Sequence, residues 1–197
     1  MRLAPNSKTD MALGVALGGR EVGLAIATRE HLVYDGILNL QKIKTEELRE
    51  RQFAVGIARR LDRYPVTRLA VVVLETPGTV KVPLVEIECR RLAGIARERN
   101  LTLTTYRSSE VKAKLLPNHS RPSTRALGNE LGTRFLSLAG KAPSAEPVPG
   151  ADLVPALALM RRTVVTAHER YWSRMFLALG AALVDLDAEL LSRLPPC

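Results

Sequence analysis

Short apolar runs alternate with polar turns through the first forty residues of the chain. The runs lie at 11–17, 22–28 and 31–40, and Gly18-Gly19 separates the first two. Runs of this length around a tight Gly-Gly turn are typical of strands joined in an antiparallel meander. The pattern therefore predicts three consecutive strands.

The middle of the chain alternates between helical periodicity and strand-like segments. At 45–64 the apolar residues fall on one helical face, and Thr45 can cap the first turn. The continuous β-branched run at 68–75 is typical of a strand buried on both faces. A helix at 83–99 and a threonine-rich strand at 101–107 follow.

The remaining segments are helical in pattern. We expect a short helix at 108–116, another at 124–140 and a third that begins at about Asp152. From Thr163 onward, apolar residues recur at steps of three, four or seven, which indicates one long amphipathic helix. Its apolar stripe consists of Val165, Trp172, Phe176, Leu179, Leu183, Leu186 and Leu190.

An antiparallel strand set followed by strands that alternate with helices predicts an α/β fold. The sheet should be mixed, with helices on both faces. The stripe of the last helix must be buried against some apolar surface. Two alternatives stay open at this point: the stripe packs on its own domain, or it forms a dimer interface or a docking helix for another protein.

The net charge of the chain indicates which class of partner it could bind. The chain has 197 residues and a net charge of +9, with 29 basic against 20 acidic side chains. Such an excess favours a polyanionic partner, most often nucleic acid, although a basic surface without a partner is the alternative. Aromatic residues are only 4% of the chain, so base stacking is not expected to be the main binding device.

The cysteines and the apolar segments indicate the cellular compartment in which we expect the protein. Cys89 and Cys197 lie far apart and form no CxxC pair, which argues against a disulfide framework or a zinc site. The residues 1–10 do not read as a secretory signal, and the longest apolar stretch is too short for a bilayer. We therefore expect a cytoplasmic protein that does not insert into membranes.

Several segments recur together in the order of one known family. They are "LGVALGGREVGLAIA", "AVVVLE", "TLTTYRSSEVKAKLL", "RPSTRALGNELGTRFLSL" and "ADLVPALALM". In this order the chain resembles the RuvC family of Holliday-junction resolvases, within the ribonuclease H-like superfamily. The resemblance implies a mixed five-stranded sheet flanked by helices over 11–162, with an N-terminal arm at 1–10 and a C-terminal helical extension at 163–197.

The resemblance also implies where catalytic carboxylates should stand. In that family four carboxylates hold two divalent ions. Their positions fall here on Ala16, Glu75, Asp152 and Pro155. Two of the four are therefore degenerate, and only Glu75 and Asp152 remain as relic or residual catalytic residues. A methyl group and a pyrrolidine ring offer Mg²⁺ no oxygen ligand.

Each surviving carboxylate also has a structural explanation. Asp152 could serve only as a helix N-cap, and Glu75 could pair with an arginine. Glu21 follows the Gly-Gly turn, and we expect it on the wrong side of the hairpin to replace a missing ligand. The sequence thus predicts no metal site, and Mg²⁺ would enter only if the site were rearranged.

Basic side chains form a second set of candidate functional residues. By the resemblance they flank the groove, where phosphate contacts need only charge and reach. The loop after Glu75, "TPGTVKVP", lacks the aromatic wedge of the family. The candidate nucleic-acid-binding residues are Arg20, Lys81, Lys112, Lys114, Arg121, Arg125 and Arg134.

Three hypotheses follow for function. The preferred one is a nuclease-inactive RuvC-like protein that binds branched or double-stranded DNA in recombination or repair, as a homodimer. The second is an active Mg²⁺-dependent Holliday-junction endonuclease with a rearranged site. The third is a structural subunit that recruits a protein partner through the helix in 163–197.

Overall fold

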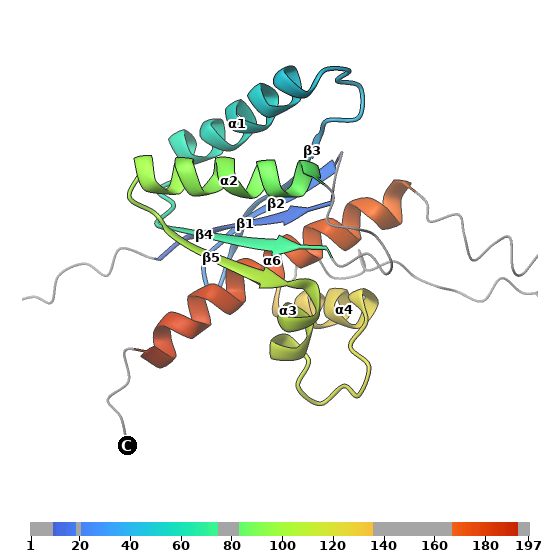
Figure 1. Cartoon of the computed structure of the whole chain (residues 1–197). Coiled ribbons are helices and arrows are strands. Elements are labelled where there is room, and N and C mark those ends of the chain that lie inside the picture. The colour runs from blue at the N-terminus through green and yellow to red at the C-terminus, as the bar shows by residue number, and fades with distance from the viewer. Residues whose placement is uncertain (1–9, 19–20, 75–82, 136–166, 193–197) are drawn as a thin grey trace, which may run out of the picture.

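The computed structural model describes residues 10–18, 21–74, 83–135 and 167–192. Five strands form a single sheet, and helices cover both of its faces (Figure 1). The helix expected from Asp152 lies outside the described residues. The strands are β1 (Ala12–Leu17), β2 (Glu21–Ala27), β3 (Leu32–Asn39), β4 (Arg68–Val73) and β5 (Thr102–Arg107).

The sheet is mixed, as the sequence pattern predicts. Its order is β3-β2-β1-β4-β5. The first three strands are antiparallel neighbours, whereas β1 runs parallel to β4 and β4 parallel to β5. Leu17, Val73 and Arg107 are in register, so β1, β4 and β5 finish at the same edge. We call this end of the sheet the carboxyl edge.

The helices that cover the two faces of the sheet come from different parts of the sequence. On one face lie α1 (Glu46–Arg63) and α2 (Pro83–Glu98). On the other face α6 (Ala167–Ser192) crosses the sheet, and α3 (Ser108–Leu115) and α4 (Thr124–Arg134) pack on α6 (Figure 1). None of the helices in the described part of the chain has the length and apolar character needed to cross a bilayer.

Helix α1 shows how closely local sequence and structure agree. The Thr45 side chain accepts a hydrogen bond from the backbone N–H of Leu48, which caps the helix as expected. Phe53, Ile57 and Leu61 are buried in the core under this helix. The predicted cap and the predicted apolar face are both confirmed.

Large and small residues separate onto opposite faces of the sheet. Alternation along β1 and β2 sends leucine, valine and isoleucine toward α1 and α2. The side chains that point toward α6 are alanines, and glycines lie between them. Small residues on that face let the helix come unusually close to the strands.

Two glycines mark the closest approach of α6 to the sheet. A Cβ atom on Gly14 would lie 2.6 Å from the carbonyl carbon of Ala178. A Cβ on Gly23 would lie 2.6 Å from the carbonyl oxygen of Arg174. Real Cβ atoms do not approach backbone this closely, so both positions need glycine while α6 keeps its place.

Of the two alternatives for the stripe of the last helix, the described part of α6 packs on its own domain. Trp172, Phe176, Leu179 and Leu183 are buried in the same core as Ala16, and Leu186 is buried against β1. The helix therefore belongs to the domain, and a division at residue 162 cuts through its core. Helical periodicity identified the apolar stripe but carries no information on the surface that covers it.

Replacing Gly14 tests the close packing of α6. We expect Gly14→Ala to lower the free energy of unfolding by about 3 kcal/mol, because the new methyl group forces α6 away from β1. The matched control is Gly94→Ala in α2, where a Cβ meets no atom within 4 Å. The control should raise stability by up to about 1 kcal/mol through helix propensity. Urea unfolding followed by circular dichroism measures both, and equal effects would contradict the packing.

Candidate functional site at the carboxyl edge

The carboxyl edge brings together segments that are far apart in the sequence. Gly14 faces Ala178, and Gly18 faces Arg174, so α6 runs antiparallel to β1. The first turns of α6 therefore lie at the ends of β1 and β4 (Figure 1). Crevices outside the carboxyl ends of parallel strands are the usual ligand sites of α/β sheets.

Ala16 is closed off from solvent at this edge. Its exposed fraction is 0%, and it belongs to the apolar core formed with α6. A buried methyl group thus stands where the resemblance expects an aspartate. Glu75, Asp152 and Pro155, the other three positions, lie outside the described residues.

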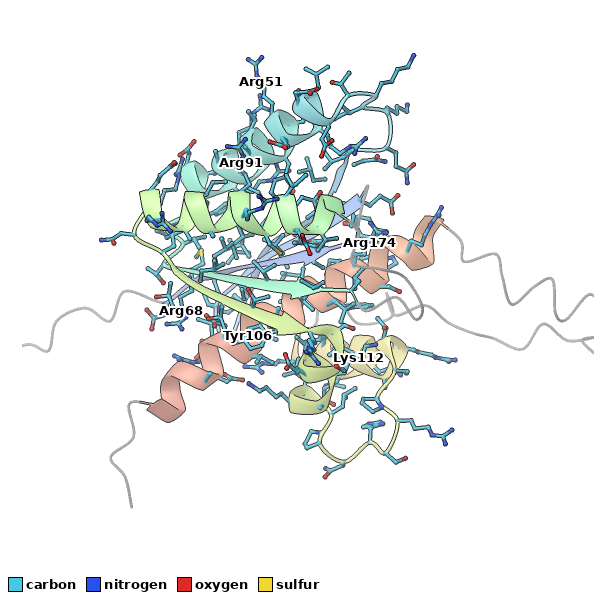
Figure 2. The ribbon with its side chains drawn as sticks, viewed as in Figure 1. Arg51, Arg68, Arg91, Tyr106, Lys112 and Arg174 are labelled. Atoms are coloured by element: carbon cyan, nitrogen blue, oxygen red, sulfur yellow. The ribbon has the colours of Figure 1, made fainter. Side chains whose placement is uncertain are left out.

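The α6 side chain that reaches the edge beside Gly18 is basic. Arg174 Nη1 donates a hydrogen bond to the backbone carbonyl of Glu21 and lies 3.3 Å from the Glu21 carboxylate oxygen Oε2. The guanidinium carbon would lie 3.0 Å from a Cβ on Gly18. Figure 2 shows Arg174 near the first turns of α6, beside the strand ends.

The carboxylate of Glu21 is held from two sides. Gln41 Nε2 donates to Glu21 Oε1 over 2.7 Å, while Arg174 approaches Oε2. The expectation that Glu21 lies on the wrong side of the hairpin is therefore wrong. Because β2 begins where β1 ends, Glu21 lies at the same edge as Gly18.

A second carboxylate near this edge is buried without a hydrogen bond. Glu88, on α2, is only 5% exposed, and neither carboxylate oxygen has a hydrogen-bond partner among the described residues. Burial raises the pKa of Glu88 to about 7, and the nearby cations Arg49 and Arg174 oppose that rise. Burial likewise lowers the pKa of Arg174, against the attraction of Glu21.

The described part of the edge does not fit a pair of divalent ions. Within the described ranges, no three histidine, cysteine, aspartate or glutamate side chains come together as a metal site. Ala16 has no ligand atom, and Arg174 is a cation with N–H donors only. Two-metal hydrolysis needs hard oxygen ligands that hold both ions, and this arrangement does not supply them.

The predicted basic residues gather on α3, α4 and the turn between them. Lys114, Arg121 and Arg125 are exposed, and Lys112 is half-buried (Figure 2). The ammonium group of Lys114 lies 5.3 Å from the centre of the Tyr106 ring. We call Lys112, Lys114, Arg121 and Arg125 the α3–α4 basic surface. Arg20 and Lys81 lie outside the described residues.

Arg134 differs from the other predicted basic residues. Its Nη1 lies 3.6 Å from Asp187 Oδ2, and its Nη2 donates to the carbonyl of Arg29 over 3.2 Å. These contacts tie the end of α4 to the C-terminal half of α6. We therefore assign Arg134 first to the fold, and only secondarily to ligand binding.

Sequence reasoning did not single out Glu88 or Arg174. Glu88 falls on the apolar stripe of α2 with Val85, Cys89 and Leu92, and Arg174 sits between Trp172 and Phe176. Arg174 lies on the opposite side of α6 from Trp172, Phe176 and Leu179, so the apolar stripe does not mark it. A charged residue inside an apolar helical stripe is the signal that could have identified Glu88. It indicates a charge that is brought into the protein rather than into solvent.

Comparisons with solved structures identify similar folds. RuvC of T. thermophilus in complex with a Holliday junction substrate has a TM-score of 0.62 and 15% identity, covering 92% of this chain and 96% of that chain. The Thermus thermophilus RuvC structure gives 0.62 and 16%, covering 91% and 96%. The yeast mitochondrial Holliday junction resolvase Ydc2 gives 0.53 and 14%, covering 94% and 82%. No protein-family model and no curated protein matches the sequence.

These likenesses show that the chain has a RuvC-like, ribonuclease H-like fold. They also correct the extent expected from the sequence. The span 11–162 is too short to make up 92% of 197 residues, so the likeness continues into 163–197. This agrees with the packing of α6 inside the domain.

Glu88 should give stability a distinctive pH dependence. The folded chain holds the Glu88 proton up to about pH 7, whereas the unfolded chain releases it near 4.5. The Glu88 contribution to the free energy of unfolding therefore falls as pH rises from 4.5 to about 7 and stays low above it. Above pH 7, Glu88→Gln should be more stable than the unmodified protein, by at most about 3 kcal/mol.

The measurement is the difference in unfolding free energy between variant and unmodified protein at pH 5 and pH 8. Glu86→Gln, at an exposed position on the same helix, is the control and should show little change with pH. A Glu88→Gln difference that is the same at both pH values would contradict the assignment.

Proposed function

We propose that this chain is a nuclease-inactive RuvC-like protein that binds branched or double-stranded DNA through the α3–α4 basic surface. The observation that carries the proposal is the combination of a RuvC-like fold with a buried methyl group at Ala16 and the Arg174 guanidinium beside Gly18, at the carboxyl edge. The similar T. thermophilus RuvC is described in complex with a Holliday junction substrate, which supports branched DNA as the ligand class.

Charge and exposure support DNA as the partner. The whole chain carries a net charge of +9. The side chains of the α3–α4 basic surface make no ion pair with any residue in the described ranges. Cations that are free of carboxylate partners can contact phosphates without first breaking an internal bond, and such contacts supply most non-specific affinity.

The site chemistry favours binding over cleavage. Ala16 is a buried methyl group, and Arg174 occupies the space beside Gly18. The alternative, an active Mg²⁺-dependent junction endonuclease, requires metal ligands from outside the described residues, such as Glu75 and Asp152. The edge itself would then place a cation beside the metal ions, which is electrostatically unfavourable.

The hypothesis of a structural subunit requires the apolar stripe of the last helix to be exposed, so that a partner can bind it. In the structure that stripe is buried. The stripe residues Trp172, Phe176 and Leu183 are at most 8% exposed, because the sheet, α3 and α4 already cover them. A partner could reach them only if α6 left the core. We therefore do not propose this role.

For the expected homodimer we propose a contact on the opposite face, between α1 and α2. A groove there has the apolar residues Ala54, Val55 and Ala58 in its lining. Arginines and glutamates also line it. Arg91 pairs with Glu50 and Arg99 with Asp62 within the chain, so Arg90 and Glu98 are the charges that a second copy related by twofold symmetry can pair across the contact. The charged residues of the lining are Glu50, Arg90, Arg91, Glu98 and Arg99.

DNA binding is tested by its salt dependence. Affinity for a four-way junction and for a duplex should fall with salt with a log–log slope of about −0.9 per phosphate contacted. Charge reversal by Lys112→Glu with Arg125→Glu should weaken binding to all sequences about equally and make the slope shallower by roughly two contacts.

The control variant places the same charge change elsewhere. Arg51 and Arg59 are exposed on α1, and α1 lies on the other face of the sheet from α3 and α4 (Figure 1). Arg51→Glu with Arg59→Glu should leave most of the affinity in place. Fluorescence anisotropy measures both variants. Equal losses would show only a general charge effect, and no binding at low salt would sink the DNA proposal.

The proposed dimer contact is tested by measuring the mass of the protein in solution. Val55 is 37% exposed, so Val55→Glu should fold normally while placing a charge in the groove. We expect the unmodified protein to have twice the chain mass of 21.6 kDa in light scattering, and Val55→Glu to be monomeric. Val33→Glu, at a 39% exposed position on β3, is the control and should stay dimeric. A monomeric unmodified protein would refute the contact.

A further inference from the structure

We propose that Arg174 is the resident cation of the carboxyl edge, holding with its guanidinium the place beside β1 that a divalent ion would need and so excluding metal. The inference rests on the proposed nuclease-inactive function and names its physical cause. It predicts that restoring a carboxylate at Ala16 is insufficient to restore metal binding.

The contacts of Arg174 are those of a bound cation. It donates to the carbonyl of Glu21 and approaches the Glu21 carboxylate, and both side chains are less than a fifth exposed, at 16% and 17%. Buried Glu88 also attracts its charge. The guanidinium therefore has an anionic group on the hairpin and another on α2.

The local backbone is shaped around this side chain. A Cβ on Gly18 would lie 3.0 Å from the guanidinium carbon of Arg174 and 2.6 Å from Leu74 Cδ1. Glycine at this position leaves the room that the guanidinium uses. The approach of α6 at Gly23 fixes the main chain of Arg174 against β2, so the side chain starts from a defined point.

Ala16 lies within reach of the same cation. Residues 14, 16 and 18 share one face of β1, because side chains alternate along a strand. Gly14 meets Ala178 and Gly18 meets Arg174, which places Ala16 between these two points of α6. A carboxylate introduced at Ala16 would pair with Arg174 rather than present free oxygens to a metal ion.

A second arginine lies near Arg174 on the same helix and provides a control for its charge. Arg170 is exposed one turn before Arg174 on α6, and its charge contributes to the lowered pKa of Arg174, after burial. Arg170 makes no hydrogen bond or ion pair with any residue that the structure describes, which makes it the matched control for Arg174.

The test measures the melting temperature of the full chain against Mn²⁺ concentration for four proteins. They are the unmodified protein, Ala16→Asp, Ala16→Asp with Arg174→Asn, and Ala16→Asp with Arg170→Asn. We expect a metal-dependent rise in the variant that lacks Arg174 and none in the other three. The rise should be roughly 4 °C when Mn²⁺ is tenfold above its dissociation constant.

Two results would overturn the inference. One is an equal rise for Ala16→Asp alone, because Arg174 would then not exclude metal. The other is no rise when Arg174 is absent. Cleavage of DNA by the unmodified protein with Mg²⁺ is a separate outcome that refutes the proposed function, whatever the melting temperatures are.

A second comparison covers the case in which Ala16→Asp fails to fold. Arg174→Met and Arg174→Lys are compared at pH 5 and pH 8. A resident cation predicts that Arg174→Met lowers the melting temperature more at pH 8, where Glu88 is ionised, and that Arg174→Lys recovers part of that loss. Equal losses at both pH values, with lysine no better than methionine, would show a packing role and contradict the proposal.

Discussion

The direct contact between the backbone of α6 and the first hairpin is the constraint on which the rest of the structure depends. Gly14 and Gly23 leave no room for a Cβ between strand and helix. Because the helix rests on main chain rather than on side chains, it cannot rotate or slide without a clash. Its register then decides which residues reach each end of the sheet.

Both ends of α6 carry a charged contact that follows from this register. At the carboxyl edge Arg174 binds Glu21, and toward the other end Asp185, only 1% exposed, lies 2.6 Å from Arg68 Nε. The Tyr106 hydroxyl donates to Asp185 over 3.0 Å, and burial followed by this carboxylate raises the pKa of Tyr106. Buried ion pairs contribute little net stability but penalise other registers, because an unpaired buried charge is costly.

The strands and most helices could be predicted because their signals are local. Alternation, the Gly-Gly turn and the cap at Thr45 each act over a few residues. The place of α6 could not be read from periodicity, although the face of small residues on the hairpin was an available signal of a close helix. The sequence shows directly that Ala16 has no carboxylate, and the place of Glu88 in the apolar stripe of α2 was an available local signal. The contacts of Arg174 with Glu21 and Gly18 depend on tertiary structure that no local pattern encodes.

We propose that this RuvC-like fold binds DNA without cutting it. The most direct measurement incubates the unmodified protein with a labelled four-way junction in Mg²⁺, in Mn²⁺ and in EDTA, then follows complex formation and strand integrity in the same samples. We expect a protein–junction complex of equal affinity in all three solutions at matched ionic strength, with every strand intact. Metal-dependent strand cleavage that disappears in Glu75→Gln would contradict it.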